Sequence, residues 1–206
     1  MMTPRLFVDL CEDAYDDDKI TFRKDGTEVL VRNTPEGQVY AFRGTSFDMG
    51  DILSDMRAVP WWDSQLGWCH KGFLRGAQGV WPWFLNGDEP RYLTGHSKGG
   101  AEAVLVAAML AFSGLPAAGL VTFGAPAPSY GGHVKKLLKD TPQQRYVNAV
   151  DCIPSHPILG SHPSPRVQLR DWSLDDRFLH PTLRFTDHKI AEYDVALGGW
   201  LHPHDR

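Results

Sequence analysis

A glycine-rich polar turn containing one serine lies between two apolar runs in residues 92–110, YLTGHSKGGAEAVLVAAML. Gly95, Ser97 and Gly99 fit the pattern G-x-S-x-G, which is typical of a sharp turn from a strand into a helix. A Cβ at either glycine would collide with the neighbouring strand or helix, and the serine backbone is strained. The helix start offers N–H groups to a developing oxyanion, so we predict that Ser97 is a nucleophile. The alternative, an ordinary helix N-cap, leaves the second glycine pair unexplained.

A serine nucleophile needs a base, and the base needs a carboxylate that orients it. In α/β hydrolases these partners follow in the chain order serine, Asp or Glu, histidine. Asp151 comes directly after the apolar run YVNAV, at the same predicted sheet edge as Ser97. We therefore predict that Asp151 is the acid, with a turn or helix cap as the alternative role.

Several histidines follow Asp151 and could be the base: His156, His162, His180, His188, His202 and His204. His156 is too near Asp151 in sequence to fold back easily. His162 and His180 each precede a proline in an irregular region, and the last two histidines lie in the C-terminal tail LHPHDR. Spacing favours His188, which stands just before an amphipathic segment, and leaves the others open.

The elements that would position these residues follow from the hydrophobic pattern. Residues 5–16 have helical periodicity, and the β-rich runs GTEVLVRN and GQVYAFRG, joined by TPEG, predict an antiparallel hairpin. Further strands (PRYLTG, GLVTFGAP, QRYVNAVD) alternate with expected helices (73–85, 98–112, 134–140, 189–198). This alternation predicts parallel βαβ units and an α/β architecture, with a long irregular excursion over residues 153–187.

Length and composition indicate a single α/β domain spanning residues 1–206, with 42% hydrophobic and 22% charged residues. A formal net charge of -4 argues against a nucleic-acid partner. The N-terminus has no signal-peptide pattern, and the longest apolar stretch, Ala101–Phe112, is too short to be a transmembrane segment. We expect a cytoplasmic location, with release by lysis or specialised secretion as alternatives.

Cysteine and histidine usage predicts neither a disulfide framework nor a metal site. Cys11, Cys69 and Cys152 are odd in number and unrelated in spacing, which fits a reducing compartment. No Asp, Glu or Cys completes a ligand set with His202 and His204. The expected chemistry requires no cofactor and no metal.

Several segments together resemble the class 3 (fungal-type) triacylglycerol lipases and their bacterial relatives, members of the α/β-hydrolase superfamily. The matching segments are YAFRGTS, DILSDMRAVP, CHKGF, YLTGHSKGG, VTFGAP, RYVNAVDCIPSHP and DHKIAEY. They run in family order over residues 40–193. The resemblance implies an α/β-hydrolase fold: a central, mostly parallel β-sheet flanked by helices, here with an N-terminal β-hairpin.

The resemblance also implies the site residues. It assigns the catalytic triad to Ser97, Asp151 and His188, and the oxyanion hole to Thr45 and the backbone N–H of Lys98. The family usually has leucine where Lys98 stands. Because the chemistry uses only the amide, the lysine side chain is free to alter the polarity of the acyl pocket. His70 in CHKGF precedes the nucleophile, so we expect it to be structural.

By resemblance, residues 47–60 form a short lid beside the site. The apolar side chains expected to bind substrate there are Phe47, Met49, Ile52, Leu53 and Trp61. The alternative is that these side chains pack on the core. We also expect Arg43 to pair with Asp55, or else to be an ordinary exposed arginine.

The predicted function is that of a serine carboxylic ester hydrolase, a lipase or esterase that cleaves acylglycerols or other lipid esters through an acyl-enzyme intermediate. A phospholipase or an acyltransferase would use the same triad. A hydrolase fold retained as a catalytically silent binding module is the alternative of a different class. The expected partners are a lipid or small ester substrate and a transient contact with a lipid interface; the sequence leaves the oligomeric state open.

Overall fold

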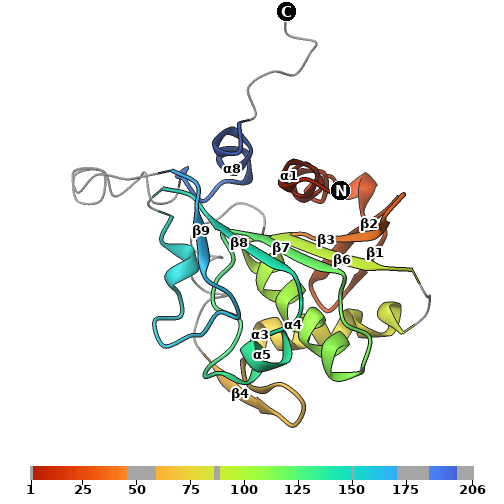
Figure 1. The fold of residues 1–206 in the computed structure, drawn as a ribbon, viewed down its shortest axis with the longest axis vertical. Helices are drawn as coiled ribbons and strands as arrows, with labels where there is room; N and C mark the ends of the chain where they lie inside the picture. The colour runs from red at the N-terminus through yellow and green to blue at the C-terminus, as the bar shows by residue number, and fades with distance from the viewer. Residues whose placement is uncertain (1, 46–58, 86–88, 150, 171–185, 199–206) are drawn as a thin grey trace, which may run out of the picture.

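The computed structural model describes residues 2–45, 59–85, 89–149, 151–170 and 186–198, and a mixed sheet runs through the described part (Figure 1). The sheet has seven strands in the order β1-β2-β3-β6-β7-β8-β9. The strands are β1 (Phe22–Lys24), β2 (Thr27–Thr34), β3 (Gly37–Phe42), β6 (Arg91–His96), β7 (Gly119–Phe123), β8 (Gln143–Val147) and β9 (Arg166–Gln168). The first three pair antiparallel, and β3, β6, β7, β8 and β9 pair parallel. The mostly parallel sheet and the β2–β3 hairpin are as predicted.

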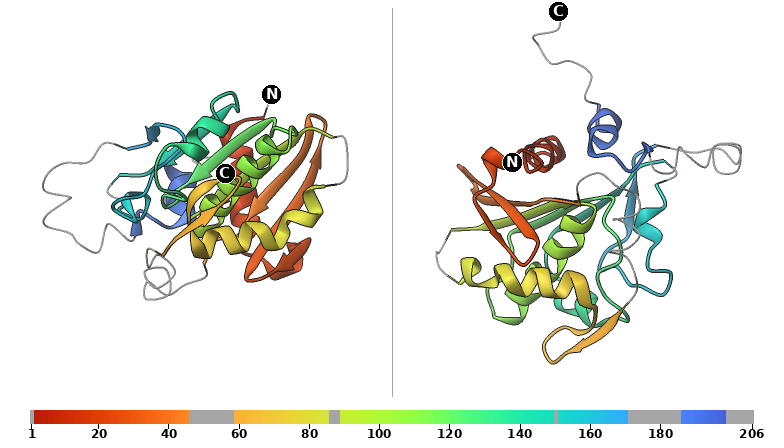
Figure 2. Two further views of the ribbon diagram at one scale, coloured as in Figure 1. Left: turned by 90° about the horizontal axis from the view of Figure 1, so that it is seen from below. Right: turned by 180° about the vertical axis from the view of Figure 1, so that it is seen from behind.

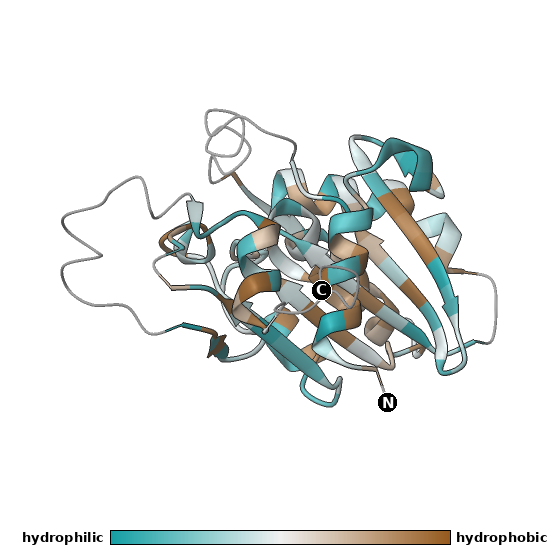
Figure 3. Cartoon of the chain, turned by 90° about the horizontal axis from the view of Figure 1, so that it is seen from above, coloured by the Kyte–Doolittle hydropathy of each residue, from teal (hydrophilic) through white to brown (hydrophobic). Residues whose placement is uncertain are grey.

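Helices cover both faces of this sheet. The helices α1 (Pro4–Asp13) and α8 (Ile190–Ala196) lie on one face, and α3 (Lys71–Val80), α4 (Lys98–Phe112) and α5 (His133–Leu137) lie on the other (Figures 1 and 2). Seen from the side of α1 and α8, these helices carry both hydrophobic and hydrophilic residues (Figure 3), as amphipathic elements do. The α/β-hydrolase architecture is thereby confirmed.

Each face of the sheet has its own apolar core. Along β3, Val39 and Ala41 pack with α1 and α8, whereas Tyr40 and Phe42 pack with α3 and α4. This alternation follows from the two-residue period of a strand. Because both faces are covered, the carboxyl edge of the parallel strands is where loops can build a site.

A second, two-stranded sheet was not predicted. It consists of β4 (Pro60–Asp63) and β5 (Gly67–His70), within the stretch interpreted as lid and adjoining residues. The turn forms because Asp63 Oδ1 accepts the backbone N–H groups of Gln65 and Leu66, an Asx-type turn that the periodicity analysis overlooked. The short strands β1 and β9 were also missed.

No helix in the described ranges is both long and apolar enough to cross a bilayer.

Candidate active site

The predicted nucleophile lies at the junction of β6 and α4. Ser97 has φ 53° and ψ −129°, a conformation that non-glycine residues rarely adopt. A Cβ on Gly95 would lie 2.5 Å from the carbonyl carbon of Gly99, and one on Gly99 would lie 2.2 Å from the carbonyl oxygen of Phe42. The two glycines of the pattern are therefore needed for the close approach of helix α4 to strands β6 and β3, as the sequence predicted.

The structure brings Ser97, Asp151 and His188 into one hydrogen-bonded chain. Nε2 of His188 lies 2.8 Å from Oγ of Ser97, and Nδ1 lies 2.8 Å from Oδ2 of Asp151. All three residues are buried. Because a carboxylate only accepts, Nδ1 carries the proton of a neutral imidazole, and the lone pair of Nε2 faces the serine hydroxyl. This is the arrangement in which histidine acts as a general base.

Further donors hold the carboxylate of Asp151 in place. The hydroxyl of Tyr193, on α8, donates to Oδ2 at 2.6 Å, and the backbone N–H of Ile153 donates to Oδ1 at 2.9 Å. Burial, and then the neighbouring Asp151, raise the pKa of Tyr193 well above its usual value, so its hydroxyl stays protonated and donating. Both carboxylate oxygens thus have fixed partners, which orients the acid toward the imidazole.

Gly124 lies so close to the triad that no side chain fits there, and the sequence analysis did not single out this residue. A Cβ here would lie 2.9 Å from Oδ2 of Asp151 and 3.0 Å from Nδ1 of His188. Its φ of 59° also favours glycine. In the sequence, the segment VTFGAP, which was expected to be a strand and matches the family pattern, was the only signal for this residue.

The predicted oxyanion residues lie on two elements that meet beside Ser97. Thr45 follows β3, and Lys98 is the first residue of α4, where backbone N–H groups have no carbonyl partner within the helix. Between them, a Cβ on Gly44 would lie 2.3 Å from the Tyr15 hydroxyl and 3.3 Å from Cβ of Ser97. The segment after β3 can therefore lie this close to Ser97 only because residue 44 is glycine. The oxyanion roles of Thr45 and Lys98 remain predictions.

The ammonium of Lys98 is held by an ion pair and a carbonyl. Its Nζ donates to the carbonyl oxygen of Gly26 at 2.6 Å and lies 3.5 Å from Oε1 of Glu102. Glu102 is fully buried one turn along α4. The lysine that departs from the family pattern therefore has an acidic partner within α4, and its effect on the acyl pocket stays a prediction.

Arg43 has two acidic partners among the described residues. Its Nη1 bonds Asp17 and, at 2.8 Å, Glu28, and its guanidinium lies 5.7 Å from the centre of the Tyr15 ring. The side chain is 13% exposed. Arg43 is thus not an ordinary exposed arginine, and its partners come from η1 (Asp17–Lys19) and β2. Asp55 lies outside the described residues, so the expected pair with it stays a prediction.

Other predicted residues have these positions. Phe47, Met49, Ile52 and Leu53, with most of the 47–60 lid, lie outside the described residues, as do His180, His202 and His204. Trp61 is on β4, half exposed, with the Lys71 ammonium 4.6 Å from its ring centre.

Two of the alternative histidines, His156 and His162, have partners close in sequence. His156 Nδ1 bonds the carbonyl of Cys152, and His162 Nε2 bonds the carbonyl of Pro154. His70 is buried and stacks on Phe73, which agrees with a structural role. Among the described residues, no group of three or more His, Cys, Asp or Glu side chains could hold a metal.

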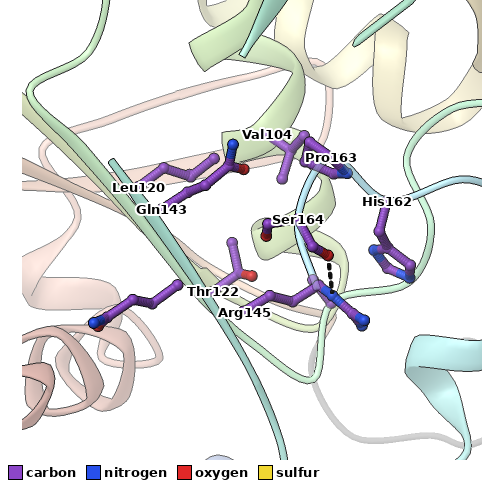
Figure 4. Close-up of a pocket in the computed structure, with 10 residues that line it drawn as sticks. Val104, Leu120, Thr122, Gln143, Arg145, His162, Pro163 and Ser164 are labelled. Atoms are coloured by element: carbon purple, nitrogen blue, oxygen red, sulfur yellow. Dashed lines mark hydrogen bonds between the residues drawn. The ribbon is translucent and has the colours of Figure 1, made fainter. Parts of the chain in front are cut away.

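A small hollow is lined by residues of α4, β7 and β8 and of the segment 162–164 (Figure 4). Arg145 and His162 line it, and Arg145 Nε donates to the carbonyl of Ser164. Burial and Arg166 lower the pKa of Arg145 to about 10, and burial and Arg145 lower that of His162 to about 4. Because no triad residue lines this hollow, we assign it no substrate.

A serine at a strand–helix turn, bonded through a histidine to a carboxylate on a mostly parallel covered sheet, defines a serine hydrolase of the α/β-hydrolase class. The chain belongs to the class 3 lipase family: the family model Lipase (class 3) matches residues 39–160. No curated protein matches the sequence.

Solved structures of fungal lipases share the fold. A triacylglycerol lipase described as having a serine protease triad at its catalytic centre is 19% identical, with a TM-score of 0.72, over 90% of this chain and 91% of that one. The Rhizomucor miehei triacylglyceride lipase is 20% identical, with a TM-score of 0.67, over 90% and 89%. The lipase in the Rhizomucor miehei lipase propeptide complex is 20% identical, with a TM-score of 0.65. The match covers 82% of this chain and 65% of that chain.

Proposed function

We propose that the protein hydrolyses carboxylic esters of lipids through an acyl-enzyme intermediate. The observation that carries the proposal is the chain Asp151–His188–Ser97, with both hydrogen bonds at 2.8 Å. Membership of the class 3 lipase family supports the same chemistry.

The mechanism follows from the donor and acceptor positions. His188 Nε2 takes the Ser97 proton as Oγ attacks the ester carbonyl, and Asp151 stabilises the resulting imidazolium. The imidazolium then protonates the departing alcohol oxygen. Water attacks the acyl-enzyme with His188 again as base, which releases the carboxylic acid and restores the Ser97 hydroxyl.

The oxyanion would be held between the end of β3 and the start of α4. The backbone N–H groups of Thr45 and Lys98 are the proposed donors, and the Thr45 hydroxyl is a third. Loss of one such donor costs about 3 kcal/mol of transition-state stabilisation.

The test uses Ser97→Ala with a short p-nitrophenyl ester and a fluorophosphonate probe. We expect the wild type to turn over the ester and to form a Ser97 adduct. The variant should keep its fold but lose both reactions. Turnover retained by the folded variant would refute the assignment. An unlabelled, inactive wild type would favour the binding-module alternative.

For the substrate class, we propose acylglycerols, with a phospholipase or acyltransferase as the alternative. The support is the family and its fungal neighbours, which are described as triacylglycerol lipases. A panel of tributyrin, longer triacylglycerols and phosphatidylcholine, with Ser97→Ala as control, would separate the alternatives. Faster release of fatty acid from phosphatidylcholine than from every triacylglycerol would contradict the proposal.

We further propose that the β4–β5 hairpin contacts a lipid surface. Trp61, Trp62 and Trp68 are 51%, 58% and 49% exposed, and tryptophan is favoured at membrane–water interfaces. The hairpin lies on the edge of the molecule opposite α1 and α8 (Figures 1 and 2).

Backbone contacts connect this hairpin to the active-site loop. Ser129 bridges both Cys69 of β5 and Ser161, and the N–H of Tyr130 donates to the carbonyl of Trp68. The same segment begins at Gly124, which contacts the triad. A hairpin seated on lipid would therefore hold the triad at a fixed position relative to the surface.

Binding to phosphatidylcholine vesicles by sedimentation tests this contact. Replacement of all three hairpin tryptophans by serine should lower partitioning about tenfold, since each indole loses apolar contact with lipid. Trp83→Ser is the control, because Trp83 is also half exposed but lies on η2 (Trp81–Phe84) and stacks on Phe22. Equal partitioning of the triple variant and the wild type would contradict the contact.

A further inference from the structure

The residue before the nucleophile, His96, contacts the backbone of the proposed base, His188. His96 is buried, and its Nε2 lies 2.6 Å from the backbone carbonyl oxygen of His188. Its Nδ1 lies 2.7 Å from the hydroxyl of Tyr15, which follows α1. The mechanism described above uses neither Tyr15 nor the ring of His96.

Donor and acceptor chemistry fixes the protonation of this pair. A carbonyl only accepts, so Nε2 of His96 carries the hydrogen and Nδ1 accepts from the Tyr15 hydroxyl. Burial, and then the neighbouring His188, lower the pKa of His96 well below its usual value, so the ring stays neutral. Burial likewise raises the pKa of Tyr15, which keeps its hydroxyl protonated.

The Tyr15 hydroxyl also packs against Gly44, the residue before the proposed oxyanion residue Thr45. A Cβ on Gly44 would lie 2.3 Å from the Tyr15 oxygen. A hydrogen-bonded path therefore runs from Tyr15 O–H to His96 Nδ1 and from His96 Nε2–H to the carbonyl of His188, and it begins beside Gly44.

The segment that bears His188 depends on side-chain donors. Besides the bond from His96, the amide Nδ2 of Asn148 donates to the carbonyl of Asp187 at 3.3 Å. Two consecutive carbonyls are thus held by side chains from β6 and from the loop after β8. Such contacts matter because a displacement of about 1 Å at a reacting group can cost about 100-fold in rate.

We propose that His96 and Tyr15 are positioning residues: together they fix the backbone of His188, and with it Nε2 against Ser97 Oγ, and Tyr15 packs this path against the segment after β3 that contains Thr45. The inference rests on the proposed esterase function and deepens it. Neither side chain touches substrate. Tyr15 lies before the segment that matches the family model, so one of the two positioning residues stands outside that match.

The structure offers a matched control between the same two elements. Sγ of Cys11 on α1 lies 3.3 Å from Oγ1 of Thr94 on β6, and both residues are buried. Thr94→Val removes this contact without touching the His96 path. A role in packing alone predicts similar effects for the two contacts, whereas a positioning role predicts loss of kcat only for the path to His188.

The experiment measures kcat and KM on a short soluble ester and the free energy of unfolding for four variants. We expect His96→Leu to lower kcat about 100-fold and Tyr15→Phe about tenfold, with KM within about twofold. His96→Gln should recover much of the loss, since its amide can donate to the carbonyl of His188 and accept from Tyr15. Thr94→Val should lower stability and leave kcat within about twofold.

A direct readout is the tautomer of His96, from ring ¹⁵N chemical shifts in the wild type and in Tyr15→Phe. We expect hydrogen on Nε2 and none on Nδ1 in the wild type. Hydrogen on Nδ1 would overturn the inference, as would equal kcat for Tyr15→Phe, His96→Leu and the active wild type. An inactive wild type that fluorophosphonate does not label would overturn the proposed function itself, and the positioning role with it.

Discussion

At the scale of single residues, the site depends on groups that act through Asp151 and His188. The carboxylate accepts from His188, Tyr193 and Ile153, so its orientation is set by donors from three segments. Of these, Tyr193 is the donor that a single substitution removes with the least change in shape.

Tyr193→Phe should lower kcat about tenfold, because Asp151 Oδ2 loses the donor that orients it. The free energy of unfolding should fall by about 2 kcal/mol, since the deleted hydroxyl bonds a buried carboxylate and the N–H of Asn148. Steady-state kinetics and denaturant unfolding measure the two effects. Tyr146→Phe is the control, because its hydroxyl bonds only the side chain of Gln144 in the described structure. Equal kcat for both variants would argue against orientation by Tyr193.

At the scale of elements, the start of α4 is placed by steric fit against β3 and β6. Gly99→Ala should lower the free energy of unfolding by about 3 kcal/mol, because the new Cβ would overlap the carbonyls of Phe42 and Arg43. Relief of this overlap would move the start of α4, which carries the proposed oxyanion amide of Lys98. The activity of the folded fraction should therefore also fall. Gly132→Ala, where a Cβ meets nothing within 4 Å, should leave both unchanged in thermal unfolding and ester assays. Equal melting temperatures for the two variants would contradict this account of the strand–helix turn at Ser97.

Substitution in the ion pair Lys98–Glu102 of α4 should affect stability but not catalysis. Lys98→Leu, which introduces the family's usual residue, removes the ammonium 3.5 Å from Glu102, whose side chain is only 1% exposed. We expect a loss of about 3 kcal/mol in unfolding free energy, because a buried carboxylate loses its opposite charge. Because the chemistry uses the Lys98 amide, kcat of the folded enzyme should change little. The double variant Lys98→Leu/Glu102→Leu should regain stability, and a single variant as stable as the wild type would contradict the argument.

At the scale of the whole molecule, the sequence predicted those features that depend on residues close together in the chain. The β2–β3 hairpin, the βαβ alternation and the strained turn at Ser97 follow from alternation, turn residues and glycine positions within short windows. The contact between Tyr15 and His96 could not be predicted, because it joins residues that only tertiary packing brings together. The partners of Arg43 could not be predicted for the same reason, because Asp17 and Glu28 come from two segments that only tertiary packing brings to it.

The buried acidic groups predict how the folded molecule responds to alkali. Burial raises the pKa of the Cys11 and Cys69 thiols from 9.0 to about 12, and it also raises those of Tyr15 and Tyr193. Above about pH 9 the unfolded chain releases these thiol protons while the folded protein retains them, so each step in pH favours unfolding.

The stabilising contribution of the thiols is therefore fully present below about pH 9 and is lost as the pH rises toward 12. Each thiol should reduce the unfolding free energy by about 1.4 kcal/mol per pH unit within that window. Denaturant unfolding in reducing buffer at several pH values between 7 and 11 measures this slope. Cys11→Ala should be less stable at neutral pH but decline less steeply, because one titrating group is gone; a slope equal to that of the wild type would show that the Cys11 thiol does not titrate in this way.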